Sequence, residues 1–265
     1  MKKLLTLVVA LALVSFAQVA KAQTSSELEL SGNVTTVVGY ERQLKGSATN
    51  AVSPAAGLLT DGLGLQTGFQ DDVFLFAVDQ VELDLAKSFG ENIRLRADLD
   101  FSPVRAPAAA GVYTEQAYVT ANVPVGNGVE FLVGRFNSGI GFDPVDRNEL
   151  KTVSFSMPHR VLLPNNLTGA RLGYQATDAL WFDLFVVNNL QDAVGFNLAA
   201  SSAYPSGGLN VKYSWGDEDA ASWAKLSLAG GPEDTTAGHS KHFTFLGDLS
   251  GNVAVSDAFS VGASG

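Results

Sequence analysis

The sequence predicts an all-β fold, a transmembrane antiparallel up-and-down β-barrel. The first observation is the segment Ile93–Phe101, in which apolar and charged residues alternate without a break. Successive side chains of a strand point to opposite faces, so this segment has one apolar and one charged face. The second observation is that the alternation recurs about ten times, and the third is an N-terminal export signal. Amphipathic strands behind an export signal indicate an outer-membrane barrel.

Residues 1–22 are the expected signal peptide. A basic start precedes the apolar run Leu4–Val19, and Ala20–Ala22 is a small-x-small cleavage site. The alternative, an N-terminal membrane anchor, is disfavoured because the run is short for a spanning helix and the processing site follows directly. We therefore expect an exported chain whose barrel domain is residues 23–265.

Composition excludes several classes of function. The formal net charge is −10, and loss of Lys2, Lys3 and Lys21 with the signal makes it −13. Phosphate binding needs a basic surface, so nucleic acid is not an expected partner. The chain has no Cys, which excludes disulfides and thiolate chemistry. The 27 Gly and 9 Pro favour many strands with many turns.

The first three strands are expected from their alternation. Residues 27–40 form the first, and the Gly/Ala/Ser-rich residues 41–70 are expected to be a long exposed loop. The second and third, residues 73–87 and 93–101, form a hairpin across a short turn. On its charged face we expect opposite charges to meet across the hairpin, which would stabilise neighbouring strands. The residues concerned are Glu82, Asp84, Arg94 and Arg96.

The later strands follow the same pattern, and short turns alternate with longer connections, as in bacterial outer-membrane barrels. The expected ranges are residues 113–123, 129–136, 167–175, 180–187, 207–215, 223–230 and 242–255, with an eleventh strand from residue 259. Single-chain barrels have an even number of strands and usually end in one, whereas this pattern stops shortly after residue 259. We expect the chain to be truncated, with the barrel completed beyond Gly265.

Lipid exposure decides which face points outward. Arg or Lys facing lipid near the midplane costs ~2–4 kcal/mol, so the apolar face of each strand must be the lipid face. Four aromatic residues near expected strand ends are predicted to belong to the interface girdles of such barrels. They are Tyr40, Trp181, Trp215 and Trp223.

Several short strand-and-turn segments carry a family resemblance. They are Leu30–Asn33, Asp79–Leu85, Glu115–Val119, Val133–Gly141, Leu167–Tyr174 and Val186–Asn189. These segments resemble the OmpL-like outer-membrane β-barrel porins, and the likeness covers most of residues 28–265. The resemblance implies a water-filled, non-enzymatic channel in a Gram-negative outer membrane, for passive diffusion of small hydrophilic solutes. Its partners would be outer-membrane lipid and those solutes, and a homo-oligomer stays open.

Selectivity in such a pore depends on its width and its lining charges. The inward charged residues are therefore the pore-lining candidates: Glu82, Asp84, Arg94, Arg96, Asp98, Asp100, Arg171, Asp183 and Lys212. For any one of them, the alternative is a solvated lumen residue in a charge ladder that stiffens the wall.

The irregular stretch 139–151 is the candidate constriction loop, because it places several charges close together after the fifth strand. They are Asp143, Asp146, Arg147, Glu149 and Lys151. The alternative is an ordinary external loop with a short helical turn.

Metal and catalytic motifs are weak. His239 and His242 lack an evident third ligand, and His239 beside Ser240 shows no orienting group for a triad. Asp71 and Asp72 could bind Ca²⁺, although a solvated loop end is the simpler interpretation. We expect no catalytic residue, metal or cofactor. Two other functions stay open: a secreted soluble β-rich binding or adhesion module, and an outer-membrane barrel enzyme.

Overall fold

The computed structural model describes residues 27–41, 73–101, 112–151, 155–156, 158–159, 162–190, 204–216, 222–234, 241–256 and 259–265. The signal peptide, the loop 41–70 beyond Glu41, Asp71, Asp72 and His239 lie outside these residues. The strands are β1 (Glu29–Glu41), β2 (Val73–Phe89), β3 (Ile93–Asp100), β4 (Tyr113–Val123), β5 (Val129–Asn137), β6 (Asn166–Thr177), β7 (Leu180–Val187), β8 (Ser206–Trp215), β9 (Ser222–Asp234), β10 (Lys241–Ser256) and β11 (Phe259–Ser264), with a 3-10 turn η1 (Arg147–Glu149) between β5 and β6.

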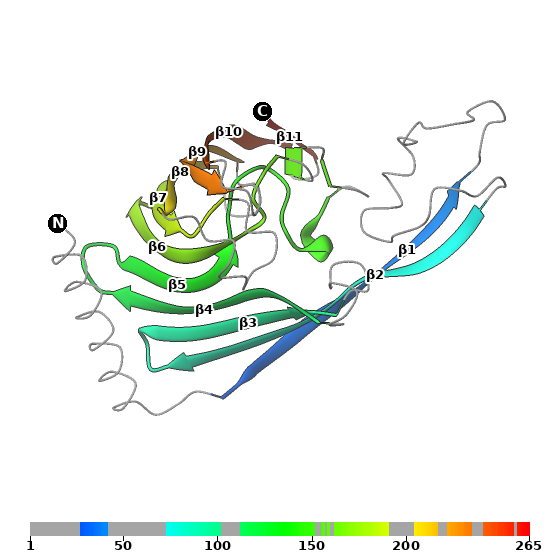
Figure 1. The fold of residues 1–265 in the computed structure, drawn as a ribbon, viewed down its shortest axis with the longest axis horizontal. Coiled ribbons are helices and arrows are strands. Elements are labelled where there is room, and N and C mark those ends of the chain that lie inside the picture. Colours follow the sequence, from blue (N-terminus) through cyan, green and yellow to red (C-terminus); the bar gives the residue numbers. More distant parts are fainter. Residues whose placement is uncertain are drawn as a thin grey trace.

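All eleven strands form one antiparallel sheet in sequence order, which confirms the expected all-β, up-and-down architecture. The sheet curls from β3 round to β11, and the long β1–β2 ribbon runs on past the end of β3 (Figure 1). The connection that carries η1 lies on the inner side of the curve. Among the described residues the edge strands β1 and β11 do not pair, so the sheet is open rather than a closed barrel.

The two faces of the sheet differ as the alternation predicts. Large apolar side chains are exposed on the outer face, with Leu30 65%, Leu184 56% and Phe245 71% exposed. Polar side chains such as Asn210 and Ser227 alternate with them and are buried on the inner side. No helix in the described part of the chain has the length and apolar character to cross a membrane.

Glycines allow close strand contacts at the centre of the sheet. Gly134 has φ +139°, and a Cβ there would lie 2.2 Å from the carbonyl oxygen of Ala117. Its register partner Gly169 would bring a Cβ to 2.1 Å from the Val186 carbonyl oxygen. Only glycine fits at these two positions, because any side chain would overlap the backbone of the neighbouring strand.

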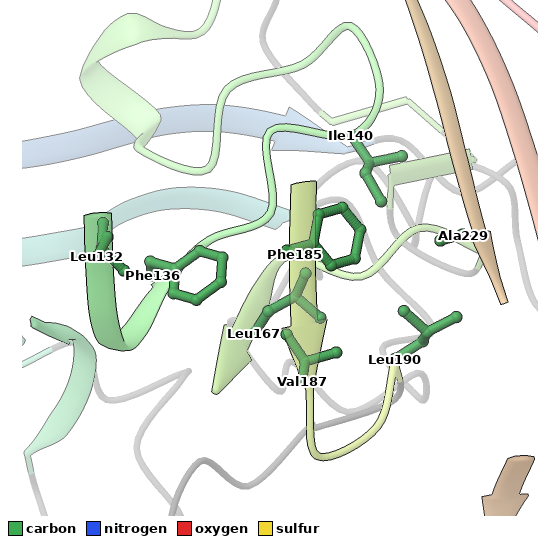
Figure 2. Packing of buried hydrophobic residues seen from close by; sticks show 8 residues of the cluster. All are labelled: Leu132, Phe136, Ile140, Leu167, Phe185, Val187, Leu190 and Ala229. Carbon is green, nitrogen blue, oxygen red and sulfur yellow. The ribbon is translucent and has the colours of Figure 1, made fainter. Parts of the chain in front are cut away.

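The inner face also carries an apolar patch, which the expectation of a polar inner face did not include. Its members are Leu132, Phe136, Ile140, Leu167, Phe185, Val187, Leu190 and Ala229, and Figure 2 shows them gathered around one another. Phe185 and Val187 share the face of Asp183, so the inward phase of β7 is polar at one end and apolar at the other. Ile140 belongs to the β5–β6 connection, and burying its side chain requires an apolar surface on the strands.

The lipid-facing assignment of the outer face is testable by depth. Leu184 lies in the middle of β7 and Val123 at the end of β4, and both are exposed on the outer face. Arg at Leu184 should destabilise the folded protein by ~2–4 kcal/mol, and Arg at Val123 by ~0–1 kcal/mol. Refolding of L184R and V123R into lipid vesicles, titrated with urea, measures both. Equal, small losses would mean that this face meets water.

Candidate functional site

A polypeptide strap crosses the inner face of the sheet. The strap, residues 138–151, leaves β5 and is held by side chains of β8, β9 and β10. Asn210 donates from Nδ2 to the Ser138 carbonyl oxygen at 3.3 Å, and Lys225 Nζ donates to the carbonyl oxygens of Gly139 and, at 2.7 Å, of Gly141. Charge-assisted hydrogen bonds of this kind are stronger than neutral ones. The strap is therefore anchored to the wall opposite its own strand.

Apolar contacts also hold the strap against the inner face of the sheet. Ile140 is 4% exposed and packs in the inner apolar patch. The ring of Phe142 stacks on Trp223 of β9, with centroids 5.7 Å apart and planes 22° from parallel. Beyond it, Gly262 of β11 lies so close to the Phe142 ring that a Cβ would come within 2.2 Å of Cζ. The strap thus extends from β5 to β11.

Carboxylates crowd the inner face where β2, β3 and β4 meet the strap. One carboxylate oxygen each of Glu82, Glu115 and Asp146 lies within 4.8 Å of the others, and the same holds for Glu82, Asp84 and Asp98. These five residues form the acid cluster. Oxygen donors at this spacing are the type that hard cations prefer. The cluster thus gathers five carboxylates on this part of the inner face.

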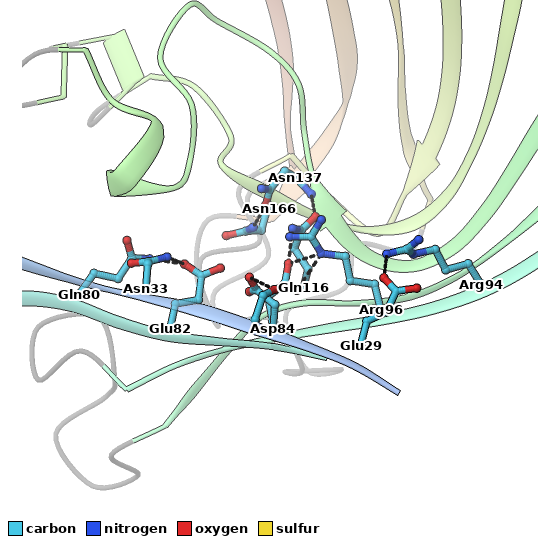
Figure 3. Close-up of polar contacts among 12 residues, drawn as sticks. Glu29, Asn33, Gln80, Glu82, Asp84, Arg94, Arg96, Gln116, Asn137 and Asn166 are labelled. Atoms are coloured by element: carbon cyan, nitrogen blue, oxygen red, sulfur yellow. Dashed lines mark hydrogen bonds and ion pairs between the residues drawn. The ribbon is translucent and has the colours of Figure 1, made fainter. Parts of the chain in front are cut away.

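Amide side chains brace the cluster. Gln80 and Asn33 donate from their amide nitrogens to Glu82 Oε2 at 3.0 and 3.2 Å, and Gln116 Nε2 donates to Asp98 Oδ2 at 2.5 Å. Figure 3 shows these contacts along the β1–β4 wall. Arg96 adds an ion pair, with Nε 2.8 Å from Asp98 Oδ1. Glu82 and Asp98 are therefore held in fixed positions rather than loosely solvated.

The other cations of the inner face are paired with carboxylates or lie over an aromatic ring. Arg94 pairs with Glu29 at 2.6 Å and Arg171 with Glu130 at 2.7 Å. Lys212 and Lys225 are register partners on β8 and β9, and each ammonium lies 5.6 Å from the centroid of the Trp223 ring. Each of these cations thus has a partner, either a carboxylate or the ring of Trp223.

The structure departs from the expected charge pairing across the β2–β3 hairpin, although Asp84 and Arg96 still lie within electrostatic range of each other. Glu82 lies opposite Asp100, and Asp84 opposite Asp98, whereas Arg96 lies opposite Ala86. The pair Phe89–Ile93 closes the hairpin, and every other pair is counted from it. Arg96 instead binds Asp98 two residues along its own strand.

Two tryptophans expected in the interface girdle lie on the inner face instead. Trp181 donates from Nε1 to Asp183 Oδ2 at 3.4 Å, and Trp223 stacks on the strap. Each is two residues from an inward charged residue, Asp183 or Lys225, so the strand phase places it inside. Trp215 is 40% exposed, beside Tyr213.

Sequence reasoning missed several inward residues, among them Glu115, Arg135 and Lys225. A bulge between Asp98 and Leu99 leaves Glu115 outside the register, so that Glu115 and Gln116 are both buried. Lys225 alternates with Ser227 on β9, and this dyad could have identified it. Arg135 is 2% exposed, and its Nε donates to the Glu115 carbonyl oxygen.

The remaining candidates are placed as follows. Asp183 accepts from Asn210 Nδ2 at 2.9 Å, and Asp100 is buried beside Gln80, with Nε2 and Oδ2 3.5 Å apart. In the strap, Asp146 reaches the acid cluster, Arg147 begins η1, and Asp143, Glu149 and Lys151 line a hollow beside Trp223.

The match to known families settles the affiliation of the chain. Residues 27–265 match the family described as "Putative beta-barrel porin-2, OmpL-like". The chain belongs to this family. Membership implies an outer-membrane β-barrel of the porin type, as the sequence resemblance predicted. Comparison with curated proteins gives no match for the chain.

The anchoring role of Lys225 can be tested by removing its ammonium. Lys225→Met deletes the bonds to Gly139 and Gly141 and leaves two strap carbonyl oxygens without a cationic donor, at ~1.5–3 kcal/mol for a bond to a charged group. We expect a looser strap, seen as higher and noisier single-channel conductance in planar bilayers. Lys212→Met is the matched control, because it removes a positive charge from the register partner of Lys225 on the neighbouring strand. In the described part of the chain, Lys212 makes no hydrogen bond to the strap. Identical noise in both variants would contradict the anchor.

Proposed function

We propose that the protein is a non-enzymatic porin that allows passive diffusion of small hydrophilic solutes across a Gram-negative outer membrane, after export with a cleaved signal peptide. The observation that carries the proposal is the curled sheet with an apolar outer face and a charged inner face crossed by the strap. Outer-membrane lipid would cover the outside, and water and solutes would fill the inside.

The exposed outer face favours this function over a soluble binding module. Side chains such as Phe243 and Phe245 are more than two thirds exposed, and similar residues recur along β1, β7, β10 and β11. Soluble monomers rarely expose contiguous apolar surface on this scale, whereas lipid covers it without penalty.

The strap is the proposed constriction. It occupies the inner side of the curve, with Asp146 at the acid cluster and Asp143 and Glu149 at the hollow beside Trp223. A pore narrowed by a pinned loop excludes large solutes, and the charges at the narrow point act on ions at close range. Removing the strap should therefore widen the pore.

The acid cluster makes the proposed pore prefer cations. Asp146 of the strap lies beside Glu82 and Glu115 of the wall, so the strap and the wall both contribute carboxylates to the cluster. Arg96 offsets Asp98 of the cluster, whereas Arg94 and Arg171 are paired with carboxylates outside it. A region lined by one sign of charge concentrates counter-ions.

Reversal potentials in a KCl gradient test the preference. The double variant Asp84→Asn/Asp146→Asn removes two half-buried charges from the acid cluster while keeping the side-chain volumes. We expect its potassium-to-chloride permeability ratio to fall at least about twofold, because less negative potential remains on the path. Glu91→Gln, at the exposed β2–β3 turn, is the control and should leave the ratio unchanged. A wild-type pore that prefers chloride would contradict the assignment.

A further inference from the structure

We propose that the hollow between the strap and β9–β10 is a binding subsite for a neutral sugar ring. This inference rests on the proposed porin function and names the class of solute that the pore would recognise. The hollow measures about 180 Å³. Its polar and aromatic lining is Phe142, Asp143, Glu149, Lys151, Trp223 and Asn252.

The size of the hollow restricts the ligand. Pockets for drug-sized molecules usually measure ~300–1,000 Å³, so this hollow suits a single monosaccharide-sized unit. Longer molecules would have to extend along the pore. A small subsite on the wall of an open path can hold a solute briefly without closing the pore, because binding must also allow release.

The aromatic pair supplies a flat apolar surface. Phe142 and Trp223 are stacked, and both are half-buried, unlike the fully buried members of the inner apolar patch. The C–H-bearing face of a pyranose packs on such a surface, because aromatic rings have an electron-rich face. Trp223 lies on β9 and Phe142 of the strap stacks on it, so the aromatic surface is formed before any ligand arrives.

Groups of both signs surround the hollow, so a ligand with a single net charge meets like charge there. Asp143 and Glu149 would repel an anion, and Lys151, with Lys212 and Lys225 at the Trp223 ring, would repel a cation. A neutral polyhydroxy compound meets neither penalty, because its hydroxyl groups both donate and accept hydrogen bonds. This mixed charge distinguishes the hollow from the acid cluster.

An amide completes the set of hydrogen-bonding groups. Asn252 of β10 is the register partner of Trp223 and is 8% exposed. Its side chain offers a donor and an acceptor beside the aromatic surface. Two neighbouring strands therefore fix the stacking surface and the amide relative to each other, while the strap adds the carboxylates and Lys151.

Three probes of similar ring size test the proposal: D-glucose, D-glucuronate and D-glucosamine. Each is added to the full chain in planar bilayers, and saturable current block gives its binding constant. Intrinsic tryptophan fluorescence of the folded protein in detergent measures the same binding without a channel. We expect glucose to bind more tightly than either charged analogue.

Variants connect the block to the hollow. Trp223→Leu should weaken glucose binding at least about fivefold, Trp223→Phe should restore much of it by retaining a ring, and Asn252→Ala should weaken it separately. Trp215→Leu, on the outer face, is the matched control and should bind glucose as the wild type does. Equal binding by Trp223→Leu and the wild type would overturn the subsite, as would tighter binding of glucuronate or glucosamine.

The two proposals fail in different ways. A protein that conducts ions but shows neither glucose block nor a fluorescence change overturns the subsite and leaves the porin function intact. A protein that gives no conductance, yet shows a glucose-dependent fluorescence change lost in Trp223→Leu, overturns the porin function and supports the subsite.

Discussion

The continuous ladder of backbone hydrogen bonds from β1 to β11 is the constraint on which the rest of the structure depends. In lipid each backbone N–H and C=O must find a partner within the protein, and neighbouring strands supply it. The ladder fixes the side-chain period at two, so every strand must present one face to lipid and one to the interior. The exposed Leu184 and the buried Asp183 are consecutive residues on opposite sides of this boundary. Outer apolar surface and inner charge are two results of one backbone geometry.

The inner face is not polar throughout, because the strap packs against part of it. A segment that crosses the interior carries backbone groups without strand partners, and these need donors from the wall. Lys225, Asn210 and Ser250 provide them, with Ser250 Oγ 3.4 Å from the Gly141 carbonyl oxygen. Phe185 and Val187 belong to the apolar patch in which Ile140 packs. The inner wall is therefore partly a binding surface for the chain's own strap, which explains why its residues are not uniformly polar.

Strand positions could be predicted from the sequence because they depend on local alternation. The bounds of β4 and β7 match the expected 113–123 and 180–187, and the other strands agree within a few residues. The candidate site could be predicted only in part, because register and bulges are not local. Glu82 faces Asp100 because one pair, Phe89–Ile93, sets the hairpin count. Glu115 joins the acid cluster only because a bulge turns it inward. The contact of Lys225 with Gly141 spans 84 positions, and no periodicity reports such a contact.

The strap joins the two parts of the inner face that carry chemistry. Asp143 and Glu149 line the hollow beside Trp223, while Asp146 between them meets Glu82 at the acid cluster. A few residues of continuous backbone thus connect a charged region on β2–β4 with an aromatic region on β9–β10. The backbone N–H of Ser156 also donates to Asp143 Oδ2 at 2.6 Å. Ser156, which follows the strap in the sequence, is therefore held at the strap residue that lines the hollow. A shift of the strap would move residues of both regions together, so the proposed ion preference and the proposed sugar subsite depend on one segment of backbone.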